Sequence, residues 1–196
     1  DLSVESEICD AILMTFYGGE TGAKAIVEGL LGQVNPAGRL PLSLPRHTTR
    51  IPCYYSILPG GEHMFVEGTR RPLYCFGHGL SYTEFAYSDL KIEKTGEYDV
   101  TVRCTVTNTG ACDGDEVVQL YIDDVESSVV TPLIALKGFQ RIHLKAGESQ
   151  EVAINLDWDS FKLMNLRCQW VVEPGEFRIC VGAASNDIRL EGTVTI

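Results

Sequence analysis

Residues 98–106 have the sequence YDVTVRCTV, in which apolar and polar residues alternate without interruption. Such alternation places the apolar side chains on one face of a β-strand and the polar ones on the other. The stretch therefore predicts a strand that buries one face. Apolar residues recur with the same period in residues 118–122, 152–156 and 177–181, and Ile188 and Leu190 begin a further strand.

Turn-forming residues separate these predicted strands, at 108–110 (NTG), 146–148 (AGE) and 174–175 (PG). About seven short strands joined by such turns are typical of a β-sandwich of the immunoglobulin or fibronectin type III kind. We therefore expect the region from residue 85 to residue 196 to form one sandwich.

The first 45 residues follow a different pattern. The apolar run at 11–17 (AILMTFY) predicts a fully buried strand, and RLPLSL at 39–44 predicts a second, short strand. Between them, residues 20–31 carry a helical apolar period, and Gly32 is placed to end that helix. This order indicates part of an α/β layer that is too small to cover its own apolar faces. The helix face comprises Ala23, Ile26, Val27, Leu30 and Leu31.

Prolines and glycines interrupt the pattern between residues 46 and 84, which predicts an irregular linker. We therefore divide the chain into an α/β segment (1–45), a linker (46–84) containing PLYCFGHGLSYT, and a fibronectin type III-like domain (85–196). The expected fold class is mainly β with an α/β part, in which a partial α/β sandwich segment precedes an immunoglobulin-like β-sandwich.

The net charge of −11 argues against nucleic acid or an anionic membrane as a partner, because such binding depends on clustered Lys and Arg. The 16 basic residues are scattered, and only Arg70 and Arg71 are adjacent. No run of about 18 apolar residues is present, so no membrane-spanning helix is predicted. The chain begins with Asp1 and shows no leader sequence, and this start resembles an internal point of a longer polypeptide.

The 7 cysteines are odd in number and lack a CxxC spacing, so they indicate neither a zinc site nor a full disulfide framework. Most lie in apolar runs, where a free thiol behaves as a small core residue. No asparagine begins an N-x-[ST] sequon. Both features favour a reducing compartment such as the cytoplasm.

Two groups of carboxylates are candidates for chemistry. Glu62 and Glu67 lie near aromatic residues in the linker, where they are either a glycosidase acid and base or solvated loop residues. Asp123, Asp124 and Glu126 could hold a cation, but they lack the spacing of a calcium loop and fit a surface charge cluster better.

His78 lies between two glycines, and this pattern predicts a tight turn in which the His78 imidazole is hydrogen-bonded. The histidines lack a metal-ligand spacing, and the serines lack a G-x-S-x-G setting. Residues 18–22 (GGETG) open a helix and could cradle an anion, although a two-glycine turn after a strand is common. From the residues alone we assign no catalytic, substrate-binding or metal-binding residue and no cofactor.

Several motifs together resemble glycoside hydrolase family 3. FYGGETGAKAIVEGLLGQVNPAGRLPLSLP (16–45) resembles the family's G-[QE]-x-G-x-x-x-A helix and the N-P-[SA]-G-[RK]-L-P segment after it. IPCYY (51–55) is similar to its P-x-Y-Y element, and PLYCFGHGLSYTEFAYS (72–88) to its PLYPFG[YH]GLSYT-F-YS hallmark. Four further stretches resemble the family's fibronectin type III-like domain. They are VTNTG (106–110), GDEVVQLYIDD (114–124), LKGFQRIHLKAGES (136–149) and WVVEPGEFRICVGAASNDIRL (170–190).

The resemblance implies a retaining, exo-acting glycosidase that removes β-glucosyl or β-xylosyl groups from the non-reducing ends of oligosaccharides or aryl glycosides. It also implies a barrel domain with an aspartate nucleophile, and a glutamate acid/base upstream of the region that matches Asp1. Neither catalytic motif is present in this sequence. We therefore expect the chain to be a non-catalytic scaffold part whose partner is the missing N-terminal barrel domain.

The FGHGLSYT element resembles a family motif that forms a structural joint between the α/β sandwich and the fibronectin-like domain. The resemblance implies that Phe76, Leu80 and Tyr82 are buried anchors, whereas Gly77 and Gly79 permit a positive φ or a close approach. The aromatic tips could instead line the approach to a sugar site. The structural motif comprises Phe76, Gly77, His78, Gly79, Leu80 and Tyr82.

Two alternatives remain open. A non-catalytic carbohydrate-binding module would need an exposed aromatic platform. Trp170 lies in an apolar strand and is expected in the core, whereas Trp158 follows a strand end and could be exposed. A protein-interaction module would instead pair its exposed sheet edges with a partner.

Overall fold

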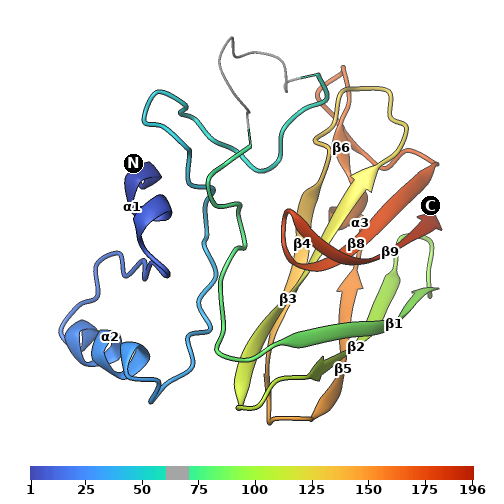
Figure 1. Cartoon of the computed structure of the whole chain (residues 1–196). Coiled ribbons are helices and arrows are strands. Elements are labelled where there is room, and N and C mark those ends of the chain that lie inside the picture. The colour runs from blue at the N-terminus through green and yellow to red at the C-terminus, as the bar shows by residue number, and fades with distance from the viewer. Residues whose placement is uncertain (61–70) are drawn as a thin grey trace.

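The structure is a computed structural model that describes residues 1–60 and 71–196 (Figure 1). Its larger part is a β-sandwich of two antiparallel sheets. The first sheet has the order β1 (Phe85–Lys94), β2 (Val100–Asn108) and β5 (Ser149–Leu156). The second has the order β4 (Ala135–Leu144), β3 (Gly114–Asp124), β8 (Glu176–Ala184) and β9 (Asp187–Thr195).

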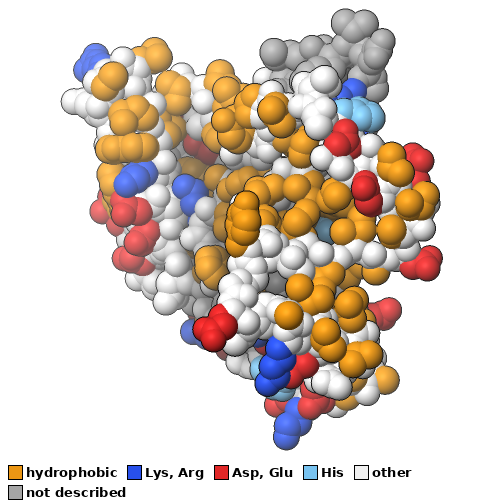
Figure 2. All heavy atoms as spheres, turned by 90° about the vertical axis from the view of Figure 1, so that its left-hand side faces the viewer, with side chains coloured by type: hydrophobic (Ala, Val, Ile, Leu, Met, Phe, Trp, Pro, Cys, Tyr) orange, Lys and Arg blue, Asp and Glu red, His pale blue; other side chains and the backbone are white. Residues whose placement is uncertain are grey.

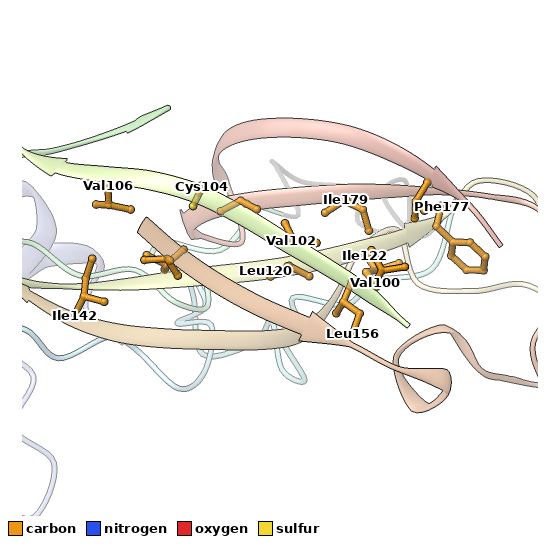
Figure 3. Close-up of a cluster of buried hydrophobic side chains, with 14 of the residues drawn as sticks. Val100, Val102, Cys104, Val106, Leu120, Ile122, Ile142, Leu156, Phe177 and Ile179 are labelled. Carbon is orange, nitrogen blue, oxygen red and sulfur yellow. The ribbon is translucent and has the colours of Figure 1, made fainter. Parts of the chain in front are cut away.

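The core lies between the two sheets, where Figure 3 shows the side chains of β2 facing those of the second sheet. Strand β2 alternates strictly, with Val100, Val102 and Cys104 buried and the residues between them half-buried. Leu120 and Ile122 of β3 meet them from the opposite sheet (Figure 3). The period-two prediction is therefore confirmed for β2, β3, β5, β8 and β9.

Strands β1 and β4 were not among the stretches that the alternation singled out. In β1 the pairing register with β2 shifts between Ser88 and Lys91, and Asp89 has a φ of 55°. This β-bulge changes which side chains face the core, so the alternation is lost in the sequence. In β4 the residues before Gln140 are half-buried on both faces or exposed, which hides the period.

A short excursion connects β5 to β8. It contains helix α3 (Trp158–Phe161) and a hairpin of β6 (Leu163–Met164) and β7 (Trp170–Val171). Helix α3 begins with a capping box, in which the Asp157 carboxylate accepts from the Ser160 N–H and the Ser160 hydroxyl accepts from the Asp157 N–H. Trp170 is 54% exposed, so its expected place in the core is wrong.

The N-terminal segment contains helices α1 (Ser3–Ile8) and α2 (Gly22–Leu30). The predicted helix is thus confirmed, and Gly32 follows it with a φ of 70°. The predicted strands at 11–17 and 39–44 are wrong, because in the described residues 39–44 form only an isolated bridge and 11–17 form no ladder. A strand needs continuous backbone hydrogen bonds with a neighbouring strand, and the described residues provide them along neither stretch.

The apolar face of α2 points away from the rest of the chain. Val27, Leu30 and Leu31 are more than half exposed, and Gly29 is the only buried residue of the helix. Figure 2 looks on the side that carries α1 and α2, and hydrophobic side chains gather over much of it. An amphipathic helix normally turns this face toward a core, which the described residues supply only in part for α2.

The thiols only partly follow the sequence expectation. None of the seven cysteines, all of which lie in the described residues, forms a disulfide. Cys104 and Cys180 are buried, and burial raises the pKa of each to about 11. Cys9, Cys112 and Cys168 are exposed, so the expectation that most are core residues is wrong. No helix in residues 1–60 or 71–196 has the length and hydropathy needed to cross a bilayer.

Candidate functional site: the joint between the N-terminal segment and the sandwich

The predicted structural motif runs antiparallel beside residues 39–44. The Leu40 N–H donates to the His78 carbonyl over 2.9 Å, and the Gly77 N–H donates to the Leu40 carbonyl over 2.8 Å. Leu44 continues this ladder, since its N–H donates to the Tyr74 carbonyl over 2.8 Å. These bonds tie the end of the N-terminal segment to the chain that enters the sandwich. In Figure 1 both irregular runs lie between the helices and strands β3 and β4.

Phe76 anchors the motif to the sandwich through aromatic contacts. Its ring stacks on Tyr55 with centroids 4.2 Å apart, and Tyr55 meets the buried Tyr121 edge-on at 6.1 Å. The Phe76 carbonyl accepts from the Ser185 N–H at the end of β8. Three segments that are far apart in sequence therefore meet at one aromatic cluster.

Gly77 has a φ of 81°, a conformation that L-residues with a Cβ rarely adopt. Its carbonyl accepts from Nε2 of the buried Gln119, and a Cβ at Gly77 would collide with the same amide. A Cβ at Gly79 would collide with the Gly38 carbonyl. The expectation of a positive φ or a close approach is thus confirmed at both glycines.

Arg39 and Glu116 form a buried ion pair across the joint. The Arg39 Nη2 and Glu116 Oε1 are 2.9 Å apart, and the side chains are only 9% and 3% exposed. Glu116 lies on β3 and also accepts from the Val117 N–H. Because each charge is removed from water, each depends on the other for compensation. The pair therefore couples the N-terminal segment to β3.

His78 stacks on Tyr74, with ring centroids 5.3 Å apart. Burial, followed by the nearby Arg39 guanidinium, lowers the pKa of His78, so that its imidazole is neutral at pH 7. The turn itself is held by its main chain, because the His78 N–H donates to the Cys75 carbonyl over 3.1 Å. A neutral ring in this position packs as part of the joint.

Leu80 and Tyr82 differ from the expected buried anchors. They are 68% and 55% exposed in this chain. The Tyr82 hydroxyl still donates to the Gly29 carbonyl over 2.7 Å and so holds α2. Its ring also borders an open groove of about 500 Å³. This groove is lined by Leu30, Leu31, Gly32, Gln33, Asn35, Tyr82, Cys112 and Asp113.

The joint depends on polar residues that sequence reasoning missed, namely Asn35, Arg39 and Gln119. Asn35 accepts from the Tyr82 N–H and donates to the Asp113 carbonyl, which links the motif to the loop before β3. Gln119 lies in a stretch of β3 that is buried on both faces. One signal for it was available, because VVQLYI has large residues on both faces of the strand.

The carboxylate candidates that the structure describes form no assembled chemical site. Glu62 and Glu67 lie outside the described residues. Asp123 is paired with Arg178 over 2.9 Å, and burial, with Glu173 and Asp123 next in importance, raises the pKa of Asp124 to about 6. Within the part of the chain that the structure describes, no three His, Cys, Asp or Glu residues are grouped to hold a metal.

Two family models match this chain. Residues 2–82 match the glycosyl hydrolase family 3 C-terminal domain, and residues 116–185 match the fibronectin type III-like domain. The joint described above therefore connects the two matched regions, because Arg39 and Gly77 lie in the first and Glu116 and Gln119 in the second.

Relatives extend the match over nearly the whole chain. A periplasmic β-glucosidase from Salmonella typhimurium is 38% identical over 94% of this chain, and a β-xylosidase from Formosa agariphila is 42% identical over 92%. A solved β-glucosidase structure from Erythrobacter marinus superimposes with a TM-score of 0.92, at 40% identity, over 98% of this chain. Each match covers 26% of the relative, so the chain spans about a quarter of their length. With both domain models matched in this order, the chain belongs to glycosyl hydrolase family 3, as its C-terminal domain region followed by a fibronectin type III-like domain.

Proposed function

We propose that this chain is the C-terminal scaffold part of a retaining, exo-acting glycosidase that hydrolyses β-glucosides or β-xylosides. The relatives named above are a β-glucosidase and a β-xylosidase, and this chain corresponds to about a quarter of each. The chain by itself is not catalytic. Its role is to complete the α/β sandwich domain that packs beside the barrel carrying the nucleophile.

The unpartnered apolar face of α2 is the observation that carries this proposal. Leu30 is 67% exposed, and Val27 and Leu31 lie beside it on the same face. Complete burial of one such side chain contributes about 1.5–3 kcal/mol, so docking of this face stabilises a complex substantially. Val4 and Ile8 form a second exposed apolar pair on α1. The occupant that fits both is the rest of the α/β sandwich domain of the longer enzyme.

We assign the parts of the chain to this role as follows. Residues 1–45 complete the α/β sandwich, residues 46–84 form the linker, and residues 85–196 form the fibronectin type III-like domain. The motif from Phe76 to Tyr82 is a structural joint that keeps the first part at a constant orientation on the last. The buried Arg39–Glu116 pair and the contacts of Gly77 with Gln119 support this role.

Hydrolysis of aryl β-glucoside and aryl β-xyloside tests the proposal. The 196-residue chain is assayed alone and mixed with the remaining N-terminal part of the longer protein. We expect no turnover by the chain alone and turnover by the mixture. Leu30→Asp should weaken the reconstituted activity, whereas Val130→Asp, at an exposed position after β3, should not. Turnover by the chain alone, or none by the mixture, would contradict the proposal.

A further inference from the structure

The excursion between β5 and β8 exposes both tryptophans of the chain. Trp158 begins α3 and is 37% exposed, and Trp170 begins β7 and is 54% exposed. Met164 lies directly across the hairpin from Trp170 and is also exposed. Large aromatic side chains are normally withdrawn from water, so two exposed indoles on one short excursion point to an interaction.

One lysine joins the two indoles into a single cluster. The Lys162 Nζ lies over both rings, 5.3 Å from the centroid of Trp158 and 4.9 Å from that of Trp170. The same ammonium lies 2.7 Å from the Asp159 carboxylate. Cation–π attraction and this ion pair together hold the rings near each other. We call Trp158, Asp159, Lys162 and Trp170 the tryptophan cluster.

The composition of the tryptophan cluster restricts what it can bind. Asp159 neutralises Lys162, so the cluster has no surplus charge with which to attract an anion. The Lys162 ammonium already lies over both rings and would repel a second cation. A fully apolar partner would bury the Lys162–Asp159 pair and lose its hydration, which is costly.

A neutral ligand with both apolar and hydroxylated surfaces fits these restrictions. Pyranose sugars in the β-gluco and β-xylo configurations present flat C–H faces that stack on indoles, and equatorial hydroxyls around their edges. The Asp159 carboxylate can accept from such hydroxyls, while the Lys162 ammonium and the indole N–H groups can donate to them. Both ring centroids lie within 5.3 Å of one ammonium, so a single short oligosaccharide can contact both.

We propose that the tryptophan cluster is a carbohydrate-binding site for β-linked glucose or xylose chains. The choice of sugar rests on the proposed function. The ring geometry and the Lys162–Asp159 pair are observed independently of it. The site would keep a polymeric substrate near the enzyme between successive hydrolytic steps.

The intrinsic fluorescence of the chain offers a direct test, because its only two tryptophans are both in the cluster. The 196-residue chain is titrated with cellohexaose and with xylohexaose while indole emission is recorded. We expect a saturable change with at least one of them. Trp158→Phe and Trp170→Phe each leave one reporter, and each remaining indole should still respond. No change with either sugar would overturn the proposal.

Affinity electrophoresis in gels containing soluble β-glucan or xylan supplies the matched comparison. Trp170→Ala should weaken retardation at least about tenfold, as truncation of a central aromatic contact does. Phe139→Ala removes another exposed aromatic ring, from β4, and should leave retardation unchanged. Thermal melting of each variant shows that the sandwich is folded. Equal retardation of Trp170→Ala and the unmodified chain would refute the site.

Two further outcomes separate this proposal from the proposed function. An indole response to the N-terminal part of the longer protein, without any response to sugars, would make the cluster an internal interface and overturn the binding site. Oligosaccharide binding by the cluster, combined with no hydrolysis by the longer protein, would contradict the proposed function alone.

Discussion

Breaking the buried Arg39–Glu116 pair provides the sharpest test of the joint. Arg39→Met keeps a shorter, unbranched apolar side chain but leaves the Glu116 carboxylate, which is 3% exposed, without its countercharge. Removal of one partner from a buried pair typically costs about 3–5 kcal/mol. Arg39→Met/Glu116→Leu removes both charges, and such replacements often leave the free energy of unfolding nearly unchanged. We therefore expect a large loss in each single variant and recovery in the double variant.

Two measurements follow this double-mutant cycle. Urea unfolding monitored by indole emission reports on the sandwich, and limited proteolysis reports on residues 39–60 at the joint. If the N-terminal segment detaches, Glu116 regains water and the loss seen by urea is limited to the free energy of docking. The loss would then appear as faster proteolysis. Arg39→Met with unchanged unfolding and unchanged proteolysis would refute the coupling, and so would a double variant as unstable as both singles combined.

Three other variants test separate features by thermal or urea unfolding. Gly77→Ala introduces both a strained φ and a collision with Gln119. It should lower the free energy of unfolding by about 1–3 kcal/mol more than Gly147→Ala, where φ is 77° but the space is open. Equal losses in the two variants would contradict the close approach at Gly77. Tyr82→Phe removes the hydrogen bond to Gly29, and should cost about 1 kcal/mol and speed hydrogen exchange in α2, with unchanged exchange as the refuting result. Asp124 has a folded pKa of about 6, above its usual value, so its contribution to stability is present below about pH 4 and is lost as pH rises through 6. Asp124→Asn should therefore stabilise the chain by up to about 1 kcal/mol at pH 8 and by nothing at pH 4, and a gain that does not depend on pH would exclude this cause.

The candidate site could be predicted only in outline. The two glycines were expected to permit unusual backbone geometry, and Gly77 has the positive φ that its place in FGHG indicates. Leu80 and Tyr82 were expected inside, but burial depends on what lies opposite, and the described chain covers these side chains only in part. Trp170 fails for the same reason, because a two-residue strand in a surface hairpin can have an apolar neighbour and still face solvent.

The sequence by itself determined part of the local structure of this protein. Alternation of period two is a property of the strand backbone, so YDVTVRCTV and the stretches like it specified their strands without knowledge of the rest. The helical period and Gly32 likewise specified α2 and its end.

Only the tertiary structure decided which surfaces meet. The Arg39–Glu116 pair joins residues that are 77 positions apart, and Gln119 reaches Gly77 across 42 positions. Charge and hydrogen-bonding capacity are local properties, but their satisfaction depends on the distance between segments. That distance is set by the packing of the chain as a whole, which also turns the apolar face of α2 outward and places two indoles over one lysine.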